Sequence, residues 1–157
     1  MRFIGNTDAK IDAKGRVFLP AVFRRLLNGA DEGQIILRKD IFQDCLVLYP
    51  EDVWNKYIDT LRGRLNRWNK VHQQIYRQFV AEAETVTLDA NGRFLLSKRL
   101  MSAAGLNKEV KFIGMGDTIE IWDTEKAGRP FMDPDDFSAS LESIMNDTTT
   151  DQERQGN

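Results

Sequence analysis

The sequence lacks the residue sets that several classes of protein need. It has a single cysteine, Cys45, and a single histidine, His72, so an internal disulfide is impossible and no Cys/His cluster with metal-ligand spacing occurs. There is no glycine-rich phosphate loop and no defensible Ser-His-Asp pattern. We therefore expect no catalytic residue, no metal, no cofactor and no small-molecule substrate. A hydrolase that works with carboxylates alone stays open as an alternative.

Long hydrophobic runs are also absent. The longest apolar stretches span a few residues, as in "VFLPAVF" at 17–23, far short of the roughly 20 that a membrane span needs. The first ten residues show no apolar signal-peptide core. With 41% apolar and 29% charged residues, the chain is typical of a soluble globular protein. A lone cysteine without an export signal fits the cytoplasm, and we expect Cys45 to be a small buried apolar residue rather than a reactive thiol.

The charge is unevenly distributed. The net charge is −2, which taken alone argues against a nucleic-acid partner. Residues 133–157, however, hold seven acids and one base, and the rest of the chain holds 21 bases and 17 acids. Because exposed charges are screened beyond about 8 Å at physiological salt, an acidic tail need not cancel a basic face elsewhere.

A repeat organises the chain. The pentapeptide "DAKGR" at 12–16 returns as "DANGR" at 89–93, inside copies that run over 10–29 and 87–105. Each copy predicts a strand, a charged turn, a short strand, a short helix and a closing glycine. A second block that predicts strands follows in each copy, at 33–50 and at 109–123.

Local chemistry supports these elements. In both pentapeptides Asp suits the first position of a type I turn, and Gly suits the left-handed residue of the bulge that follows. In the first copy Pro20 is expected to open the helix and Gly29 to close it. In the second copy Ser97 is expected to cap the helix and Gly105 to close it.

The segment between the copies predicts helices. Apolar residues follow a 3.6-residue spacing over 53–61 and again over 68–79, with a break near Gly63. This segment is basic, and its cationic side chains are Lys56, Arg62, Arg64, Arg67, Lys70 and Arg77. They form either a solvated outer face or a direct DNA contact, and both interpretations stay open.

The predicted fold class is α+β. Each copy alone, at about 45 residues, is too small to bury a stable core, whereas two copies can close a shared sheet and remove its exposed edges. We therefore expect a pseudo-two-fold β-barrel with both pentapeptide turns on one face. The predicted organisation is a first repeat over 1–62, a connecting helix over 63–82, a second repeat over 83–145 and a polar, disordered tail over 146–157, with a short helix at 138–145.

The arginine that follows the glycine in both pentapeptides is not explained by the turn alone. Asp and Gly satisfy the turn alone, so a purely structural role for the turns does not require Arg16 and Arg93. Their guanidinium forks suit phosphate oxygens or the edge of guanine, and the turn aspartates can orient them. Lys14 adds a mobile charge in the first copy, where the second has Asn91, which can hydrogen-bond a base or a phosphate. A role in folding and solubility remains the competing interpretation.

With these motifs the chain resembles the MraZ family, in the wider class of AbrB-like swapped-hairpin DNA-binding proteins. The resemblance covers residues 1–145 and rests on "MRFIGNTDAKIDAKGRVFLPAVFR", on the second Asp-x-x-x-Arg turn, and on "CLVLYP" and "EIWD" at the ends of the repeats. It implies a bacterial transcriptional regulator that acts chiefly as a repressor. The implied target is a set of direct repeats in double-stranded DNA, upstream of the regulator's own division and cell-wall gene cluster. It also implies a ring-shaped homo-oligomer and a cytoplasmic, nucleoid-associated location.

The DNA-binding residues that we expect are Asp12, Lys14, Gly15, Arg16, Asp89, Asn91, Gly92 and Arg93. The chain departs from the family pattern at Asn91, which is less basic than the residue in some relatives, and at Ser97, where many have proline.

An assembly module without specific DNA binding is the alternative function. Phe131 and Phe137, set among Pro and Asp, are suited to docking on a neighbouring subunit. Trp54, Trp68 and Trp122 are expected to be mostly core.

Overall fold

The computed structural model describes residues 2–27 and 34–147. Two compact units make up the chain, Met1–Ala127 and Gly128–Asn157. Across the described residues, no helix combines the length and the apolar character needed to cross a membrane. Gly29, the expected end of the first short helix, and most of the predicted polar tail lie outside the described residues.

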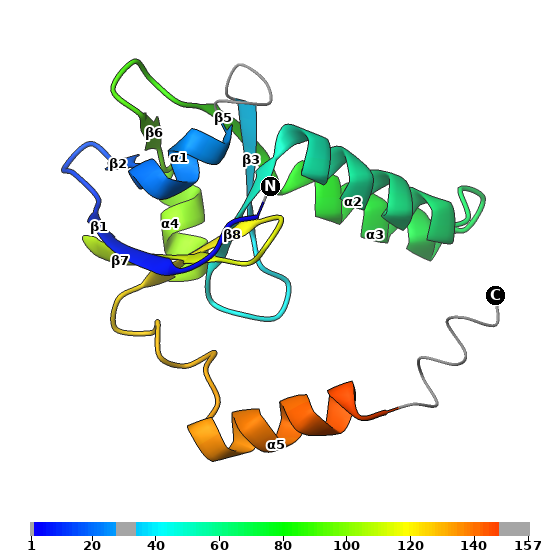
Figure 1. The fold of residues 1–157 in the computed structure, drawn as a ribbon. Coiled ribbons are helices and arrows are strands. Elements are labelled where there is room, and N and C mark those ends of the chain that lie inside the picture. Colours follow the sequence, from blue (N-terminus) through cyan, green and yellow to red (C-terminus); the bar gives the residue numbers. More distant parts are fainter. Residues whose placement is uncertain (1, 28–33, 148–157) are drawn as a thin grey trace. The chain divides into compact units, whose positions relative to one another are not determined.

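Secondary structure follows the two sequence copies (Figure 1). The first copy and the connection after it contain β1 (Asn6–Lys10), β2 (Arg16–Phe18), α1 (Ala21–Leu27), β3 (Gln34–Lys39), β4 (Leu46–Pro50), α2 (Glu51–Arg64) and α3 (Lys70–Ala81). The second copy and the segment after it contain β5 (Glu84–Thr87), β6 (Arg93–Leu95), α4 (Lys98–Ala104), β7 (Glu109–Gly114), β8 (Ile119–Asp123) and α5 (Pro134–Met145). The predicted order of strand, turn, short strand and short helix is confirmed in both copies.

The two copies exchange their first strands. The six-stranded sheet has the order β1-β7-β8-β4-β3-β5, with every neighbouring pair antiparallel. Strand β1 of the first copy thus pairs with the β7–β8 hairpin of the second, and β5 of the second pairs with the β3–β4 hairpin of the first. This arrangement makes the copies interdependent, since neither supplies a complete sheet.

The short strands form a sheet of their own. β2 and β6 pair antiparallel, with Val17 opposite Phe94. The mixed α+β class with two repeat units is confirmed. The barrel that we predicted is not seen as closed, because the short strands pair with each other and, among the described residues, no ladder joins them to the larger sheet.

One main core holds the two copies together. It is built from both sheets and both short helices, including Phe23 of α1, Leu100 of α4, Val17 of β2, Phe94 of β6 and Phe112 of β7, all of which are buried. Pairs of rings meet edge to face within it, such as Phe94 and Phe112 with centroids 6.4 Å apart. Because matched residues of both copies enter this core, the arrangement of the two turns is set by packing.

Smaller clusters cover the remaining sheet surface. Tyr49 packs with Trp54 of α2 on one of them, and Trp122 packs with Cys45 on another. Burial, and next the nearby Glu120 carboxylate, raise the pKa of the Cys45 thiol, as suits an inert core cysteine. The expectation that Trp122 is core is confirmed. For Trp68 it is wrong, because its side chain is 95% exposed in the turn between α2 and α3.

The short helices begin and end largely as their sequences predict. The Ser97 side chain accepts a hydrogen bond from the Leu100 amide at 3.2 Å, and Gly105 closes α4 in the left-handed conformation at φ 64°. In the first copy Pro20 lies one residue before α1 and accepts bonds from the amides of Phe23 and Arg24. Pro20 therefore flanks the helix rather than opening it as its first residue.

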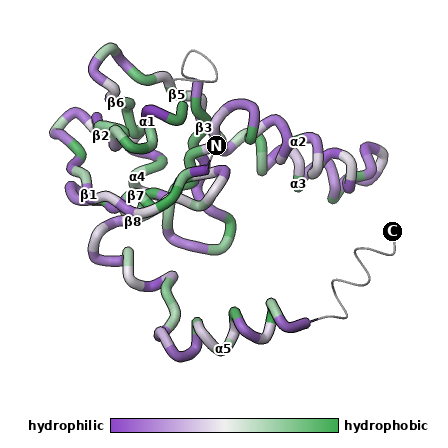
Figure 2. Tube along the Cα trace, in the orientation of Figure 1, coloured by the Kyte–Doolittle hydropathy of each residue, from purple (hydrophilic) through white to green (hydrophobic). Residues whose placement is uncertain are grey.

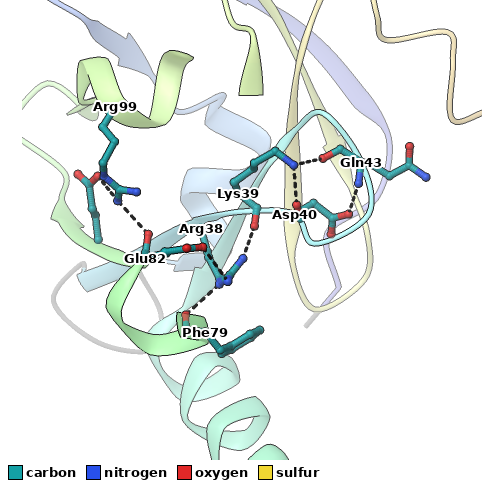
Figure 3. A network of polar contacts seen from close by, with 8 residues as sticks. Arg38, Lys39, Asp40, Gln43, Phe79, Glu82 and Arg99 are labelled. Carbon is teal, nitrogen blue, oxygen red and sulfur yellow. Dashed lines mark hydrogen bonds and ion pairs between the residues drawn. The ribbon is translucent and has the colours of Figure 1, made fainter. Parts of the chain in front are cut away.

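The connection between the copies is a helical hairpin made of α2 and α3. Gly63 lies inside α2, and the break comes at 65–69, where Asn69 caps α3 by accepting from the amides of Val71 and His72. Arg38 of β3 attaches the end of the hairpin to the sheet (Figure 3). It is buried, donates from Nε to the Phe79 carbonyl at 2.9 Å, and reaches Glu82 at 3.2 Å.

The described part of the second unit, residues 128–147, contains one helix. α5 spans Pro134–Met145, four residues longer at its start than the predicted 138–145. The Asp133 side chain caps it by accepting from the Asp135 amide at 3.2 Å, and Pro134 occupies the first turn. This combination of Asp and Pro is a helix start that the sequence analysis overlooked.

Candidate nucleic-acid interface

The two pentapeptide turns have the same backbone. In the first, the Asp12 amide donates to the Arg16 carbonyl at 2.8 Å and the Gly15 amide to the Asp12 carbonyl at 3.0 Å. The second turn repeats both bonds at the same distances. Gly15 and Gly92 have φ of 86° and 83°, a left-handed conformation that disfavours a side chain.

The aspartate of each turn holds the arginine of the same turn. Asp12 accepts from the Arg16 amide and from the Arg16 Nε, each at 2.9 Å. Asp89 makes the equivalent bonds to Arg93 at 2.9 and 3.0 Å. Each carboxylate also accepts from the amide of the third turn residue, Lys14 or Asn91, at 2.9 Å. The side chain that shapes the turn therefore also aims the arginine.

These contacts lower the pKa of both turn carboxyl groups. For Asp12 the bond from the Arg16 amide has the largest effect, and for Asp89 it is the bond from the Arg93 amide. Ionised carboxylates therefore stabilise the folded turns at every pH above the ordinary value of 3.8. This contribution is lost as the pH falls below that value and through the folded-state pKa.

Strand pairing brings both arginines to one face. In the β2–β6 ladder Arg16 is opposite Leu95 and Phe18 is opposite Arg93. Because side chains alternate along a strand, these four residues lie on the face opposite the buried Val17 and Phe94. The Arg93 guanidinium carbon is 5.7 Å from the centre of the Phe18 ring. We call this face, made of Arg16, Phe18, Arg93 and Leu95 together with the two turns, the turn face.

The turn face leaves cationic donors accessible. The side chains of Arg16 and Arg93 are 36% and 24% exposed. Their Nε atoms bond to the turn aspartates, and among the described residues their terminal Nη groups have no hydrogen-bond partner. Such anchored forks suit bidentate contact with a phosphate or a guanine edge. Phe18 and Leu95 add exposed apolar surface between them.

Arg24 is a residue of this region that the sequence analysis missed. Its Nη1 donates to the Leu19 carbonyl at 3.3 Å, and its guanidinium lies against Gly92, where an added Cβ would overlap it. Arg24 comes from α1 of the first copy, yet it reaches the turn of the second. No local signal marks it, because the contact exists only once the β2–β6 pairing is formed.

A second basic surface lies on the α2–α3 hairpin. Arg62 donates from Nη1 to the Tyr76 hydroxyl at 3.0 Å and stacks over its ring at 4.6 Å. The other cationic side chains of the hairpin are exposed. Within the described residues, no group of three or more His, Cys, Asp or Glu side chains is placed to hold a metal ion.

Comparisons with known proteins give a consistent result. The family described as "MraZ protein, putative antitoxin-like" matches residues 2–78 and again 79–126. A protein of Phocaeicola vulgatus called transcriptional regulator MraZ is 59% identical over 92% of this chain and 94% of its own length. Proteins with the same name from Christiangramia forsetii and Serratia proteamaculans are 35% and 33% identical, over 92% and 95% of this chain and 94% and 97% of their own lengths.

Proposed function

The chain belongs to the MraZ family, and from this premise we propose that it is a sequence-specific DNA-binding transcriptional regulator whose turn face contacts double-stranded DNA. As a member of a regulator family, it is not an enzyme. The observation that carries the proposal is the placement of Arg16 and Arg93 on one face, each held by an aspartate with its terminal donors accessible.

Roles follow from the position of each residue. Arg16 and Arg93 bind phosphate or guanine, Asp12 and Asp89 orient them, and Lys14 and Asn91 add contacts at the turn tips. Gly15 and Gly92 permit the left-handed turn that brings backbone close to the DNA. We further propose that the two sheets act as one pseudo-two-fold swapped-hairpin barrel, which would hold the two turns rigidly.

A single subunit makes too few contacts for tight binding. Each phosphate that is neutralised contributes about −0.9 to the slope of log affinity against log salt, and one turn face supplies only a few cations. We propose that the chain forms a ring-shaped homo-oligomer that engages direct repeats upstream of its own division and cell-wall gene cluster, where avidity raises affinity. Occlusion of the promoter then represses transcription, and the protein works in the cytoplasm at the nucleoid.

The test is a binding titration against the DNA upstream of the chain's own gene, at two salt concentrations, with random DNA as the control. The double variant Arg16→Ala with Arg93→Ala should abolish specific binding without changing the oligomer mass measured by light scattering. Arg16→Lys with Arg93→Lys keeps the charge but loses the fork, and it should retain only weak, salt-sensitive binding.

A matched pair of substitutions on the α2–α3 hairpin tests whether DNA contacts the turn face or the basic hairpin. Arg64→Ala with Lys70→Ala removes the same charge from exposed positions of the hairpin, and we expect it to leave specific binding close to that of the wild type. Unchanged binding in the Arg16/Arg93 double variant would remove the turns from the mechanism. If the chain binds neither the upstream DNA nor the random DNA at either salt concentration, the assembly module is favoured. The exposed apolar residues of the hairpin and of α5 support that alternative.

A further inference from the structure

The α2–α3 hairpin has apolar surface without cover. Neither helix contains a buried residue, although Trp54 and Phe79 stack at 5.5 Å near its attachment to the sheet. Helices of this length draw most of their stability from packing of an apolar face. We therefore expect another protein surface to cover the exposed apolar side chains of the hairpin.

A groove between the two helices offers a place for that partner. It encloses about 470 Å³ and is lined mainly by apolar surface, from Leu65, Tyr76 and Val80 among others. Arg62, Arg67 and Arg77 lie at the same groove. An apolar groove beside arginines suits an amphipathic helix with acidic flanks better than it suits a DNA backbone, which offers no apolar side.

One helix of the described residues has this chemistry. α5 exposes Phe137, Leu141 and Ile144, which are spaced i, i+4 and i+7 and so share one face. The carboxylates of the helix are Asp135, Asp136 and Glu142, and it contains no lysine or arginine. Figure 2 shows the alternation of hydrophobic and hydrophilic residues along α5.

We propose that α5 of one copy of the chain docks in the α2–α3 groove of a second copy, with its apolar face toward Tyr76 and Val80. The carboxylates of α5 lie on its other sides and give the helix a negative charge that the basic hairpin attracts. Two hairpins would repel each other, since both are basic, whereas an acidic helix is attracted. The contact joins different surfaces of the two copies, so it can be repeated from copy to copy and can close into a ring. The inference rests on the self-association in the proposed function and specifies the surfaces that carry it.

The test uses light scattering on full-length variants. Phe137→Asp with Leu141→Asp places charge on the apolar face of α5, and Ala139→Asp with Ser143→Asp is the matched control on the opposite face. On the hairpin, Val80→Asp with Ala81→Asp puts acids into the groove, and Gln74→Asp with Gln78→Asp is the control outside it. We expect both test pairs to fall to the single-chain mass of 18.0 kDa and both controls to keep the wild-type mass.

Mixing the two test variants shows whether the contact forms between copies. One retains an intact groove and the other an intact α5, so an equimolar mixture should form a species of two chains and nothing larger. Circular dichroism and urea unfolding of each variant check that the rest of the chain remains folded. The result that supports the inference is loss in both test pairs together with recovery of the two-chain species.

Other outcomes overturn it. The inference fails if the wild type has the mass of one chain, if a test pair keeps the wild-type mass, or if a control pair loses mass. It also fails if the mixture of the two test variants stays at the mass of one chain, which is the result expected if α5 docks within its own copy or elsewhere. DNA binding is scored separately. The α5 variant should keep weak, salt-dependent DNA binding through Arg16 and Arg93, whereas the Arg16/Arg93 alanine variant should lose DNA and keep its mass, so the two proposals fail in different measurements.

Discussion

The first and second turns share a backbone but differ in their surroundings. Both carry the same set of bonds around aspartate, glycine and arginine. They differ at the third position, where Lys14 corresponds to Asn91. They differ also around the glycine, because Gly15 faces the Leu96 carbonyl and Gly92 faces the Arg24 side chain. Three residues of the pentapeptide thus specify the geometry, while the third position and the neighbours adjust each copy separately.

The largest expected effect tests the core beneath the two turns. Phe94→Ala should lower the free energy of unfolding by about 3–5 kcal/mol, since it removes a buried ring and leaves a cavity. Val17→Ala, at the matched position of the first copy, should cost less because fewer buried atoms are lost. Urea unfolding of both variants measures the difference. Equal losses would mean that the Phe94 ring is not buried as described.

The two glycines should differ in their tolerance of a side chain. Gly15→Ala adds a Cβ 2.9 Å from the Leu96 carbonyl oxygen, which is backbone and cannot move away freely. Gly92→Ala meets only the flexible end of Arg24. Both variants lose about 1–2 kcal/mol because alanine disfavours the left-handed conformation. Gly15→Ala adds the backbone overlap to this cost, so it should be the more destabilising of the two in thermal unfolding. The reverse order would show that the two turns are not held as described.

Exchange of the third residues should shift DNA affinity in opposite directions. Lys14→Asn removes one cation per subunit, and Asn91→Lys adds one. If each reaches a phosphate, the slope of log affinity against log salt should change by about 0.9 per bound subunit, becoming shallower in the first variant and steeper in the second. Titrations at several salt concentrations measure this, and the swapped double variant serves as the control with unchanged net charge. Identical slopes in all variants would place the third residues away from DNA.

The smallest effect concerns pH. The pKa values of Asp12 and Asp89 should both lie below 3.8, so the turns should stay intact from neutral pH down to that value and loosen only below it. Carboxyl carbon NMR titration of the two residues measures this directly. A midpoint above 3.8 for either residue would mean that its carboxylate does not accept the turn hydrogen bonds.

Local signals predicted the repeated elements well. The Asp and Gly of each pentapeptide, the Ser97 cap and the Gly105 end depend on residues close in sequence, and the structure has each of them at the expected position. The resemblance to the MraZ family is likewise carried by contiguous motifs and is confirmed. The assignment of the eight turn residues to DNA contact stays a prediction.

Failures came where distant residues decide the outcome. Trp68 has the large apolar side chain that is typical of a core residue. It lies in the turn between α2 and α3, however, and none of the described residues covers it. The contact of Arg24 with the second turn joins residues 68 positions apart, and its own helix gives no hint of it.

By itself the sequence determined the duplicated turns and the aspartate that orients each arginine, because these depend on bonds within five residues. Only the tertiary structure decided that Arg16 and Arg93 share one face. That placement follows from the pairing of β2 with β6 and from the burial of Val17 and Phe94 beneath them. The physical reason is that burial of apolar surface is not directional, so a hydrophobic pattern states which side chains are hidden but not which strands meet above them.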